Sequence, residues 1–390
     1  MKIVFTADNH LGCYYARMTP AQLERRRLIL RQALSQVVDY ALDNEVDLFL
    51  QGGDLFDQPD PRNVEIAFVM GEIKRLETGG IRTVLIGGNH DTPRSSNAPG
   101  STAPHRILSH NSAVLYLAGS GGPEAVRLST RHGDLIVGGA SSDPGLQPGD
   151  DPLQKCSFPD NPPSILLMHC SLSGHGWMAG EPAASRESLS ACGADVVLLG
   201  HNHRAFRETA GSAVILSAGA TERLDFGEID NIPGFWALEL ESGEVQADFI
   251  PLTPQPMHRL RVAAEELALD DPTAFVLKRL SKVVDEEALL RLDIEGTLDR
   301  VAYHRLRLTE IWRFGTERSF YFDLGLSGLA LAEEEFPATG ISVDPEEELR
   351  RAAAEMIASR HDDNECLLVE EALATALIRL RGEERGQSND

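Results

Sequence analysis

The stretch TVLIGGNHD, residues 83–91, joins an apolar run directly to amide, imidazole and carboxylate side chains. The same arrangement occurs at four other places along the chain. Short runs of this kind, rich in leucine and β-branched residues, are typical of buried strands in a sheet covered on both faces. Polar side chains just past several such strands meet at one edge of the sheet, where open α/β folds place their sites. The apolar runs are residues 3–5, 46–50, 83–86, 165–168 and 196–199, and the polar blocks after them are Asp8-x-His10, Gly53-Asp54, Gly88-Asn89-His90-Asp91, His169 and Gly200-His201-Asn202-His203.

The order of these blocks resembles the pattern D-x-H, G-D, G-N-H-[D/E], H and G-H-x-H of the calcineurin-like metallophosphoesterase superfamily. The resemblance covers about residues 1–250, and no ligand position is substituted. It implies an α/β fold built as a four-layer α/β/β/α sandwich. The opening TADNHLG, the block GGDLFD and the C-terminal extension are most similar to SbcD-type nuclease subunits of DNA double-strand-break repair, which work with the ATPase SbcC.

The resemblance also implies a centre of two divalent metal ions. Mixed oxygen and imidazole ligands suit manganese, iron or zinc, and the absence of ligand thiols argues against a structural zinc site. The family favours Mn²⁺, with Mg²⁺, Fe²⁺ and Zn²⁺ as alternatives. By carry-over from the family pattern, Asp54 bridges the two ions, Asp8, His10 and His203 complete one site, and Asn89, His169 and His201 complete the other.

Hydrolysis of a phosphodiester needs a strong nucleophile, neutralisation of the phosphate charge and help for the leaving oxygen. Two divalent ions about 3.5–4 Å apart supply the first two. His90 is not a ligand in the family pattern, so we expect it to stabilise the transition state or protonate the leaving alkoxide. We expect Asp91 to support this catalysis by fixing the ring of His90, and Asp57 to hold the site in a similar way. Single residues of these types are more often turn formers or caps, but five blocks in this order are not explained by turns.

The net charge of −24 is unfavourable for binding DNA, because an acidic surface repels phosphate. Much of the acidic character lies away from the polar blocks, at residues 285–287, 333–335 and 346–348. Bound dications also reverse the sign of the charge locally. Arg62 and Arg94 lie just beyond two of the blocks, and we expect them to contact a DNA backbone. Weak DNA binding by this chain alone is the expectation.

Composition indicates a soluble globular protein, with 42% hydrophobic and 25% charged residues and no apolar run long enough for a membrane span. The first strand begins within three residues of the N-terminus, which leaves no room for a signal peptide. Five scattered cysteines without a C-x-x-C motif fit reduced thiols. We therefore expect a cytoplasmic protein that does not associate with membranes.

Four segments are expected along the chain: a nuclease domain at residues 1–252, a small α+β DNA-capping domain at 257–328, a helical partner-binding extension at 340–382 and a disordered tail at 383–390. A capping box at Thr19 predicts a helix from residue 20 to about 44, and a single helix is predicted over 298–312. Residues 93–104 and 143–163 are predicted to be long loops. An apolar stripe within 367–380 either packs on the chain's own body or docks onto an ATPase.

These observations predict a two-metal-dependent DNA nuclease, an exonuclease that also acts endonucleolytically on hairpins. The resemblance implies a homodimer whose partners are DNA and an SbcC-like coiled-coil ATPase. One alternative is a phosphatase or cyclic-nucleotide phosphodiesterase acting on a small substrate, which would need neither the additional domain nor the tail. The other alternative is a non-catalytic scaffold that tethers an ATPase, and the intact ligand set with His90 argues against it.

Overall fold

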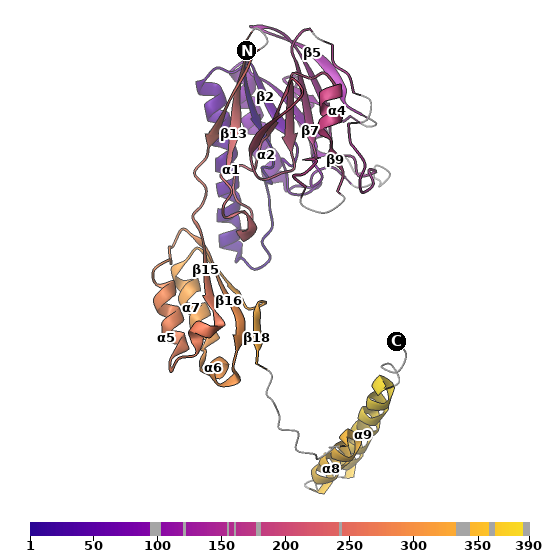
Figure 1. Ribbon diagram of the computed structural model, residues 1–390, viewed down its shortest axis with the longest axis vertical. Coiled ribbons are helices and arrows are strands. Elements are labelled where there is room, and N and C mark those ends of the chain that lie inside the picture. Colours follow the sequence, from indigo (N-terminus) through magenta and orange to yellow (C-terminus); the bar gives the residue numbers. More distant parts are fainter. Residues whose placement is uncertain are drawn as a thin grey trace. The chain divides into compact units, whose positions relative to one another are not determined.

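The computed structural model describes residues 1–93, 103–119, 122–153, 156–159, 161–176, 181–241, 244–332, 344–358 and 363–384. The chain forms two compact units, residues 1–331 and residues 332–390. The first unit contains two six-stranded sheets and a smaller sheet formed by its last four strands (Figure 1).

The first six-stranded sheet has the strand order β14-β13-β1-β2-β3-β4. Strands β1 to β4 run parallel to one another, whereas β13 and β14 pair antiparallel at one edge. The strands are β1 (Lys2–Thr6), β2 (Leu48–Gly52), β3 (Arg82–Ile86), β4 (Val114–Tyr116), β13 (Gly234–Glu241) and β14 (Glu244–Pro251), and the connecting helices are α1 (Pro20–Asp43), α2 (Asn63–Thr78) and α3 (Pro104–Leu108).

The second six-stranded sheet has the order β11-β12-β10-β7-β6-β5. Its four central strands are parallel, and β5 and β11 pair antiparallel at the two edges. Two very short strands, β8 (Ser171–Leu172) and β9 (Ala183–Ala184), form a separate pair. The remaining elements are β5 (Glu124–Thr130), β6 (Gly133–Ala140), β7 (Ser164–His169), α4 (Arg186–Ala191), β10 (Val196–Gly200), β11 (Phe206–Ala210), β12 (Ala213–Ser217) and the 3₁₀ turn η1 (Phe226–Glu228).

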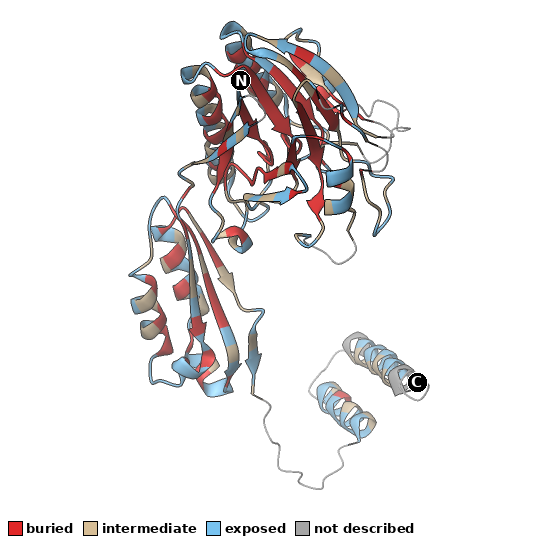
Figure 2. Cartoon of the chain, turned by 45° about the horizontal axis from the view of Figure 1, so that its top comes forward, coloured by how far each residue is buried: buried red, intermediate tan, exposed pale blue. Residues whose placement is uncertain are grey.

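Strand side chains alternate between two hydrophobic cores. Phe5 and Leu50 pack with Leu167 and Leu198 between the two sheets. The intervening residues of the first sheet, such as Phe49, pack instead against side chains of α1 and α2. Burial is accordingly concentrated along the strands of both sheets (Figure 2). This period of two, with a core on each face, confirms the predicted four-layer α/β/β/α sandwich.

Helix α1 begins as its sequence predicts. The N–H of Gln22 donates to Thr19 Oγ1 at 3.3 Å, and the N–H of Thr19 donates to Gln22 Oε1 at 2.9 Å. This reciprocal capping box satisfies two donors that the helix itself leaves unpaired. The predicted loop over residues 93–104 ends earlier than expected, because α3 starts at Pro104; residues 94–102 lie outside the described part of the chain.

Residues 257–331 form a small region, here called the β15–β18 region, in which every strand pair is parallel. The prediction of one helix over 298–312 is wrong. Asp299 accepts a hydrogen bond from the N–H of Ala302 and so caps a new helix, while Leu306 is extended and breaks it. The elements are β15 (Met257–Ala263), η2 (Ala264–Leu267), α5 (Pro272–Leu280), β16 (Leu289–Leu298), α6 (Arg300–Arg305), α7 (Leu308–Arg318), β17 (Tyr321–Gly325) and β18 (Leu329–Leu331).

The second unit contains α8 (Pro345–Ala358) and α9 (Asp363–Glu384). Leu367, Leu368 and Ile378 of α9 are exposed. Among the described residues, no helix combines the length and the apolar character that crossing a bilayer requires.

Glycine allows the two sheets to approach each other at the edge where the polar blocks lie. Gly200 ends β10, and a Cβ placed on it would lie 2.2 Å from the carbonyl oxygen of Gly52 and 2.7 Å from Nδ1 of His169. Both distances are shorter than van der Waals contact. Only glycine fits at this position without moving the end of β2 or the His169 ring.

We predict opposite effects of two glycine-to-alanine substitutions on stability. Gly200→Ala should lower the free energy of unfolding by about 1–3 kcal/mol, because the added carbon overpacks the contact between the sheets. Gly71→Ala, on the exposed face of α2 with no atom within 4 Å of the new carbon, should raise it by about 0.5–1 kcal/mol. Urea unfolding of both variants measures the two changes. Equal stability of the two variants would contradict the close approach at Gly200.

Candidate metal centre

Parallel strands of both sheets deliver the polar blocks to a single edge. Asp8, Asp54 and Asn89 follow the carboxyl ends of β1, β2 and β3 within three residues. In the second sheet, His169 is the last residue of β7 and pairs in register with Gly200 of β10, so that His201 lies just beyond it. The carboxyl ends of adjacent parallel strands lie side by side, which explains why residues far apart in sequence meet here.

The backbone at this edge is strained. Among the described residues, five non-glycine residues have a positive φ, and four of them are Asp8 (51°), His10 (45°), Asp54 (51°) and His201 (86°). All four are predicted metal ligands. Each such conformation costs on the order of 1–3 kcal/mol and persists only where the surrounding structure imposes it. Strain is therefore concentrated on the residues that form the site.

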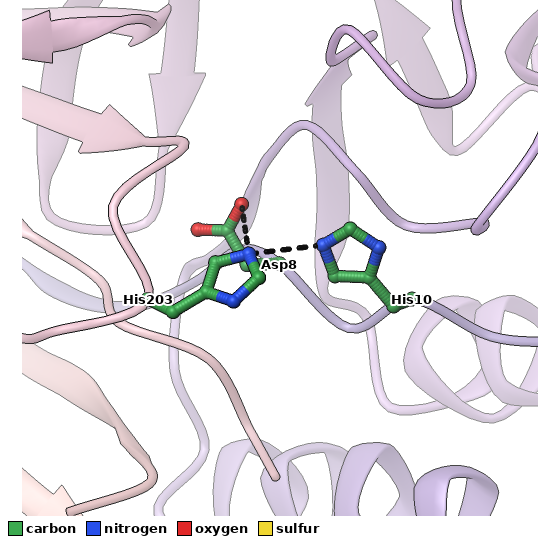
Figure 3. Close-up of side chains that lie close together, drawn as sticks. All are labelled: Asp8, His10 and His203. Atoms are coloured by element: carbon green, nitrogen blue, oxygen red, sulfur yellow. Dashed lines mark hydrogen bonds and ion pairs between the residues drawn. The ribbon is translucent and has the colours of Figure 1, made fainter. Parts of the chain in front are cut away.

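The first group of predicted ligands lies around His10 (Figure 3). Nε2 of His10 is 3.1 Å from Nε2 of His203 and 3.7 Å from Oδ2 of Asp54. Oδ1 of Asp8 lies 4.0 Å from Nε2 of His203. The ligand atoms of Asp8, His10 and His203 lie close enough together to bind one cation. The structure thus brings together the residues predicted for one of the two metal sites.

Carboxylates on the far side of these two rings fix the orientation of their nitrogens. Nδ1 of His10 is 3.1 Å from Oδ1 of Asp57, and Nδ1 of His203 is 2.6 Å from Oε1 of Glu228. Because a carboxylate only accepts, each Nδ1 carries a proton. The two Nε2 atoms therefore face each other at 3.1 Å, where two lone pairs would repel. A proton or a metal ion between them removes this repulsion, so the donor set fits a cation.

The second group has the same character. The Nδ1–H of His169 donates to the carbonyl oxygen of Gly52 at 2.8 Å, which turns Nε2 toward the site. That Nε2 is 3.1 Å from Oδ1 of Asn89 and 3.2 Å from Oδ2 of Asp54. Nδ1 of His201 is 2.9 Å from the same oxygen of Asn89. Asp54 contacts both groups, which is the position required of a bridging ligand.

Main-chain amides hold the two central carboxylates in place. The N–H of His201 donates to both oxygens of Asp8 at 3.0 and 3.1 Å. The N–H of His90 donates to Oδ1 of Asp54 at 2.8 Å. Each carboxylate is thereby oriented by a loop other than its own, so the ligand geometry depends on the packing of the two sheets.

The concentration of carboxylates controls the charge of the imidazoles. Burial disfavours the cationic form of His169, but the negative charge of Asp54 and its hydrogen bond outweigh burial and raise the pKa of His169 to about 10. Burial also opposes protonation of His203, yet the hydrogen bond to Glu228 raises the pKa of this ring to about 9. Burial and the neighbouring His169 lower the pKa of His201 to about 4. In the absence of a divalent ion, His169 and His203 therefore hold protons that balance part of the negative charge of the carboxylates.

His90 lies at the rim of the site. Its side chain is 46% exposed, and its ring contacts that of His10 edge-on with the centroids 4.7 Å apart. Nδ1 of His90 is 3.3 Å from the carbonyl oxygen of Asp57, so this nitrogen donates and Nε2 is left for a substrate. His90 therefore lies beside the predicted ligand His10, and its ring belongs to neither of the two groups of predicted ligands described above.

Asp91 does not orient the ring of His90, contrary to our expectation. It is fully buried, with Oδ1 accepting from the N–H of Gly88 at 2.7 Å and Oδ2 accepting from the N–H of Phe56 at 3.1 Å. Its remaining close neighbour is Nε2 of His105 at 3.4 Å. Asp91 instead joins the loop after β3 to the loop after β2. Asp57 contacts His10 through Oδ1, and its supporting role stays a prediction.

Arg62, which we predicted to contact DNA, lies beside two carboxylates. Nη1 of Arg62 is 3.0 Å from Oε2 of Glu24 and 3.9 Å from Oε1 of Glu65, so its charge is already compensated. Arg94 lies outside the described residues. A DNA contact of Arg62 therefore stays a prediction.

Sequence reasoning missed several residues that complete the site. Glu228 contacts His203 from a turn 25 positions further along the chain, and Glu181 has Oε2 3.9 Å from Nε2 of His201. Buried His105 lies under Asp91 and stacks on Tyr116 with 5.3 Å between the ring centroids. Neither spacing nor an apolar run distinguishes these residues in the sequence. Their roles depend on contacts that only the folded chain makes.

A cavity of about 500 Å³ opens beside the second group of predicted ligands. Asn89, His169 and His201 form part of its wall. The described part of the wall also includes the four carboxylates of Asp143, Asp150, Asp151 and Glu181. Their negative charge disfavours an anion inside the cavity.

We predict that binding of Mn²⁺ near pH 7 releases about two protons, because His169 and His203 must lose their site protons to bind a metal ion. Their pKa values are raised, so both rings are protonated at this pH, and the affinity should fall further as the pH is lowered. Calorimetric titrations in two buffers of different ionisation enthalpy measure the release. Identical heats in the two buffers would contradict the prediction.

Comparisons with known proteins agree with this geometry. Residues 1–205 match the family model described as calcineurin-like phosphoesterase. Three relatives carry the name "DNA double-strand break repair protein Mre11". The relative from Sulfurisphaera tokodaii is 29% identical over 174 residues, which are 44% of this chain and 41% of the relative. The relative from Sulfolobus acidocaldarius is 22% identical over 76% of both chains. That from Methanosarcina mazei is 26% identical over 76% of this chain and 45% of the relative.

The chain therefore spans less than half of the length of two of these three relatives. The family match is the stronger finding, because it covers more than half of the 390 residues. It also includes all seven predicted ligands, from Asp8 to His203. The chain belongs to the calcineurin-like phosphoesterase family.

Proposed function

We propose that this chain is a two-metal-dependent DNA nuclease that hydrolyses phosphodiesters in double-strand-break repair. The observation that carries the proposal is the convergence of two carboxylates, one amide and four imidazoles, with the nitrogens and oxygens of both groups turned toward each other. The names of the curated relatives support DNA repair as the setting.

The residues fit two divalent ions, of which Mn²⁺ is our choice. Bound ions of this kind acidify a water molecule and neutralise charge on the phosphate. We assign Asp54 as the bridging ligand, since Oδ2 lies within 3.7 Å of His10 in one group and 3.2 Å of His169 in the other. Asp8, His10 and His203 would complete one site and Asn89, His169 and His201 the other.

His90 is the group that we assign to the leaving oxygen. Its Nδ1 is occupied by the carbonyl of Asp57, and its half-exposed ring leaves Nε2 accessible from solvent. A proton held at Nε2 can pass to the oxygen that departs from phosphorus, which removes the cost of expelling an alkoxide. The contact with His10 keeps the ring close to the ligands while this transfer occurs.

The additional β15–β18 region and the second unit favour a polymeric substrate over a small one, because a hydrolase of small phosphate esters needs neither. This argues against the alternative of a small-substrate phosphatase or cyclic-nucleotide phosphodiesterase.

We also propose that the second unit binds an SbcC-like coiled-coil ATPase. Helix α9 exposes Leu367, Leu368 and Ile378, and exposed leucines and isoleucines on one helix are typical of a helix that packs into a partner's groove. All predicted ligands precede residue 204, so the hydrolytic site does not require this unit. A complex of this kind would supply the DNA affinity that a chain of net charge −24 lacks.

We predict that His90→Ala abolishes cleavage of a labelled DNA duplex in Mn²⁺ and leaves two ions bound. Loss of a positioned acid costs about 10²–10⁴ in rate, whereas the ligand set is unchanged. His258→Ala, which alters an exposed histidine of β15, is the matched control and should cleave like the wild type. The measurements are nuclease assays and calorimetric Mn²⁺ titrations of both variants.

Two results would oppose this assignment. If His90→Ala binds one ion fewer, His90 is a ligand rather than the proton donor. A wild-type chain that hydrolyses a generic small phosphodiester rapidly, and leaves the duplex uncut in the same buffer, favours the small-substrate alternative.

We predict that removal of residues 340–390 leaves Mn²⁺-dependent hydrolysis intact and abolishes association with the SbcC-like ATPase of the same organism. The truncated chain, residues 1–339, retains the whole of the first unit, residues 1–331. Affinity capture with the ATPase, thermal melting and hydrolysis are measured together. A truncated chain that melts at a much lower temperature and still captures the ATPase would show that the helices pack on the chain's own body.

A further inference from the structure

The turn that carries Glu228 lies between a predicted ligand and a separate hydrophobic cluster. Glu228 is 5% exposed, and both of its oxygens accept hydrogen bonds. Oε1 accepts from Nδ1 of His203 at 2.6 Å, and Oε2 accepts from the N–H of Leu224 at 2.7 Å. Because both oxygens of this buried carboxylate accept hydrogen bonds, its side chain is held in one orientation. It therefore fixes the orientation of the His203 ring that it contacts.

The hydrogen bond decides which nitrogen of His203 faces the site. With the proton on Nδ1 directed to Glu228, Nε2 is directed toward His10 at 3.1 Å and Asp8 at 4.0 Å. Without an acceptor on the far side, the ring is free to rotate or to place its proton on Nε2, and that nitrogen then loses the lone pair a metal needs.

The other side of the turn contacts the β15–β18 region. Phe226 and Ile229 pack against a cluster formed by Met257, Leu289 and Phe320. Met257 and Leu289 begin β15 and β16, and Phe320 immediately precedes β17. The turn is thus hydrogen-bonded to the predicted ligand His203 through Glu228. Through Phe226 and Ile229 it packs on the starts of three strands of the β15–β18 region.

A buried polar network holds the approach to the turn. Nη1 of fully buried Arg26 donates to Oε1 of Gln255 at 2.9 Å, and Nε2 of Gln255 donates to the carbonyl oxygen of Glu287 at 2.9 Å. Oε2 of Glu222 accepts from the N–H of Gln255 at 2.9 Å. The segment before the turn is therefore fastened to the same region by hydrogen bonds that do not involve a predicted ligand.

We infer that Glu228 is a positioning residue for His203, and that packing of Phe226 on the β15–β18 region holds Glu228 in that position. The inference rests on the proposed metal centre. Disturbance at either end of the turn, at Glu228 or at Phe226, affects the metal ion that His203 binds. Among the described residues, Asn89, His169 and His201 have no hydrogen bond to the turn, so we expect the ion that they would bind to keep its affinity.

Calorimetric Mn²⁺ titration of the full chain tests this inference with three variants. Glu228→Gln leaves one acceptor oxygen, which can accept only one of the two hydrogen bonds that Glu228 accepts. We expect this variant to weaken the binding of one ion by about 10–100-fold and to leave the binding of the other unchanged. Phe226→Ala, which does not touch His203, should weaken the same ion by about fivefold or more. Glu72→Gln is the control, since it neutralises a buried carboxylate of α2 that bonds Ser35 and Arg75 and takes no part in the contacts of the turn described above; it should lower the melting temperature and leave both affinities unchanged.

A second measurement does not depend on whether the Glu228 and Phe226 variants fold. Nitrogen NMR of the imidazoles in the zinc-loaded wild-type chain, assigned by comparison with His203→Gln, should show His203 protonated at Nδ1 only. A His203 protonated at Nε2 would overturn the inference. So would Glu228→Gln and Phe226→Ala titrations that match the wild type, or a Glu72→Gln titration that loses the same ion. If the wild type binds no ion at all, the proposed function fails first and this inference fails with it.

Discussion

The site is organised by the repulsion between acceptors that the fold forces together. Nε2 of His10 and Nε2 of His203 face each other at 3.1 Å, and Asp54 and Asn89 present oxygens to Nε2 of His169 at similar distances. Only positive charge makes such an arrangement stable. The raised pKa values of His169 and His203 express the same requirement, because protons gather where the carboxylates are crowded. The rest of the first unit can be understood as the framework that keeps these acceptors from moving apart.

That framework consists of contacts between loops rather than within them. The N–H of His201, from the second sheet, binds Asp8 of the first sheet, and the N–H of His90 binds Asp54. Asp91 joins two loops of the first sheet through Gly88 and Phe56. The geometry of the ligands is thus a property of the packed sandwich, and no single loop would reproduce it.

The sequence pattern was sufficient to predict which residues meet at this edge, but it did not identify the residues that support them. Each ligand directly follows an apolar strand, so local pattern predicts that Asp8, Asp54 and His201 reach the same edge. Glu228 was not predictable, because its contact with His203 depends on how a distant turn packs. Asp91 was misassigned for a related reason: adjacency to His90 in sequence does not place it beside the ring, and its buried carboxylate accepts from the N–H groups of Gly88 and Phe56 instead. The prediction of one helix over residues 298–312 failed because the backbone is extended at Leu306, which ends α6 before α7 begins at Leu308.

At the predicted ligands with positive φ angles, the residue type that would give the most stable backbone differs from the residue type that can bind a metal ion. At His10 and His201, replacement by glycine would relieve the strained backbone and delete a ligand in one step. Variants selected only for thermal stability would therefore accumulate changes that inactivate the site. Folding alone gives no reason for histidine at these two positions, whereas the proposed metal site does.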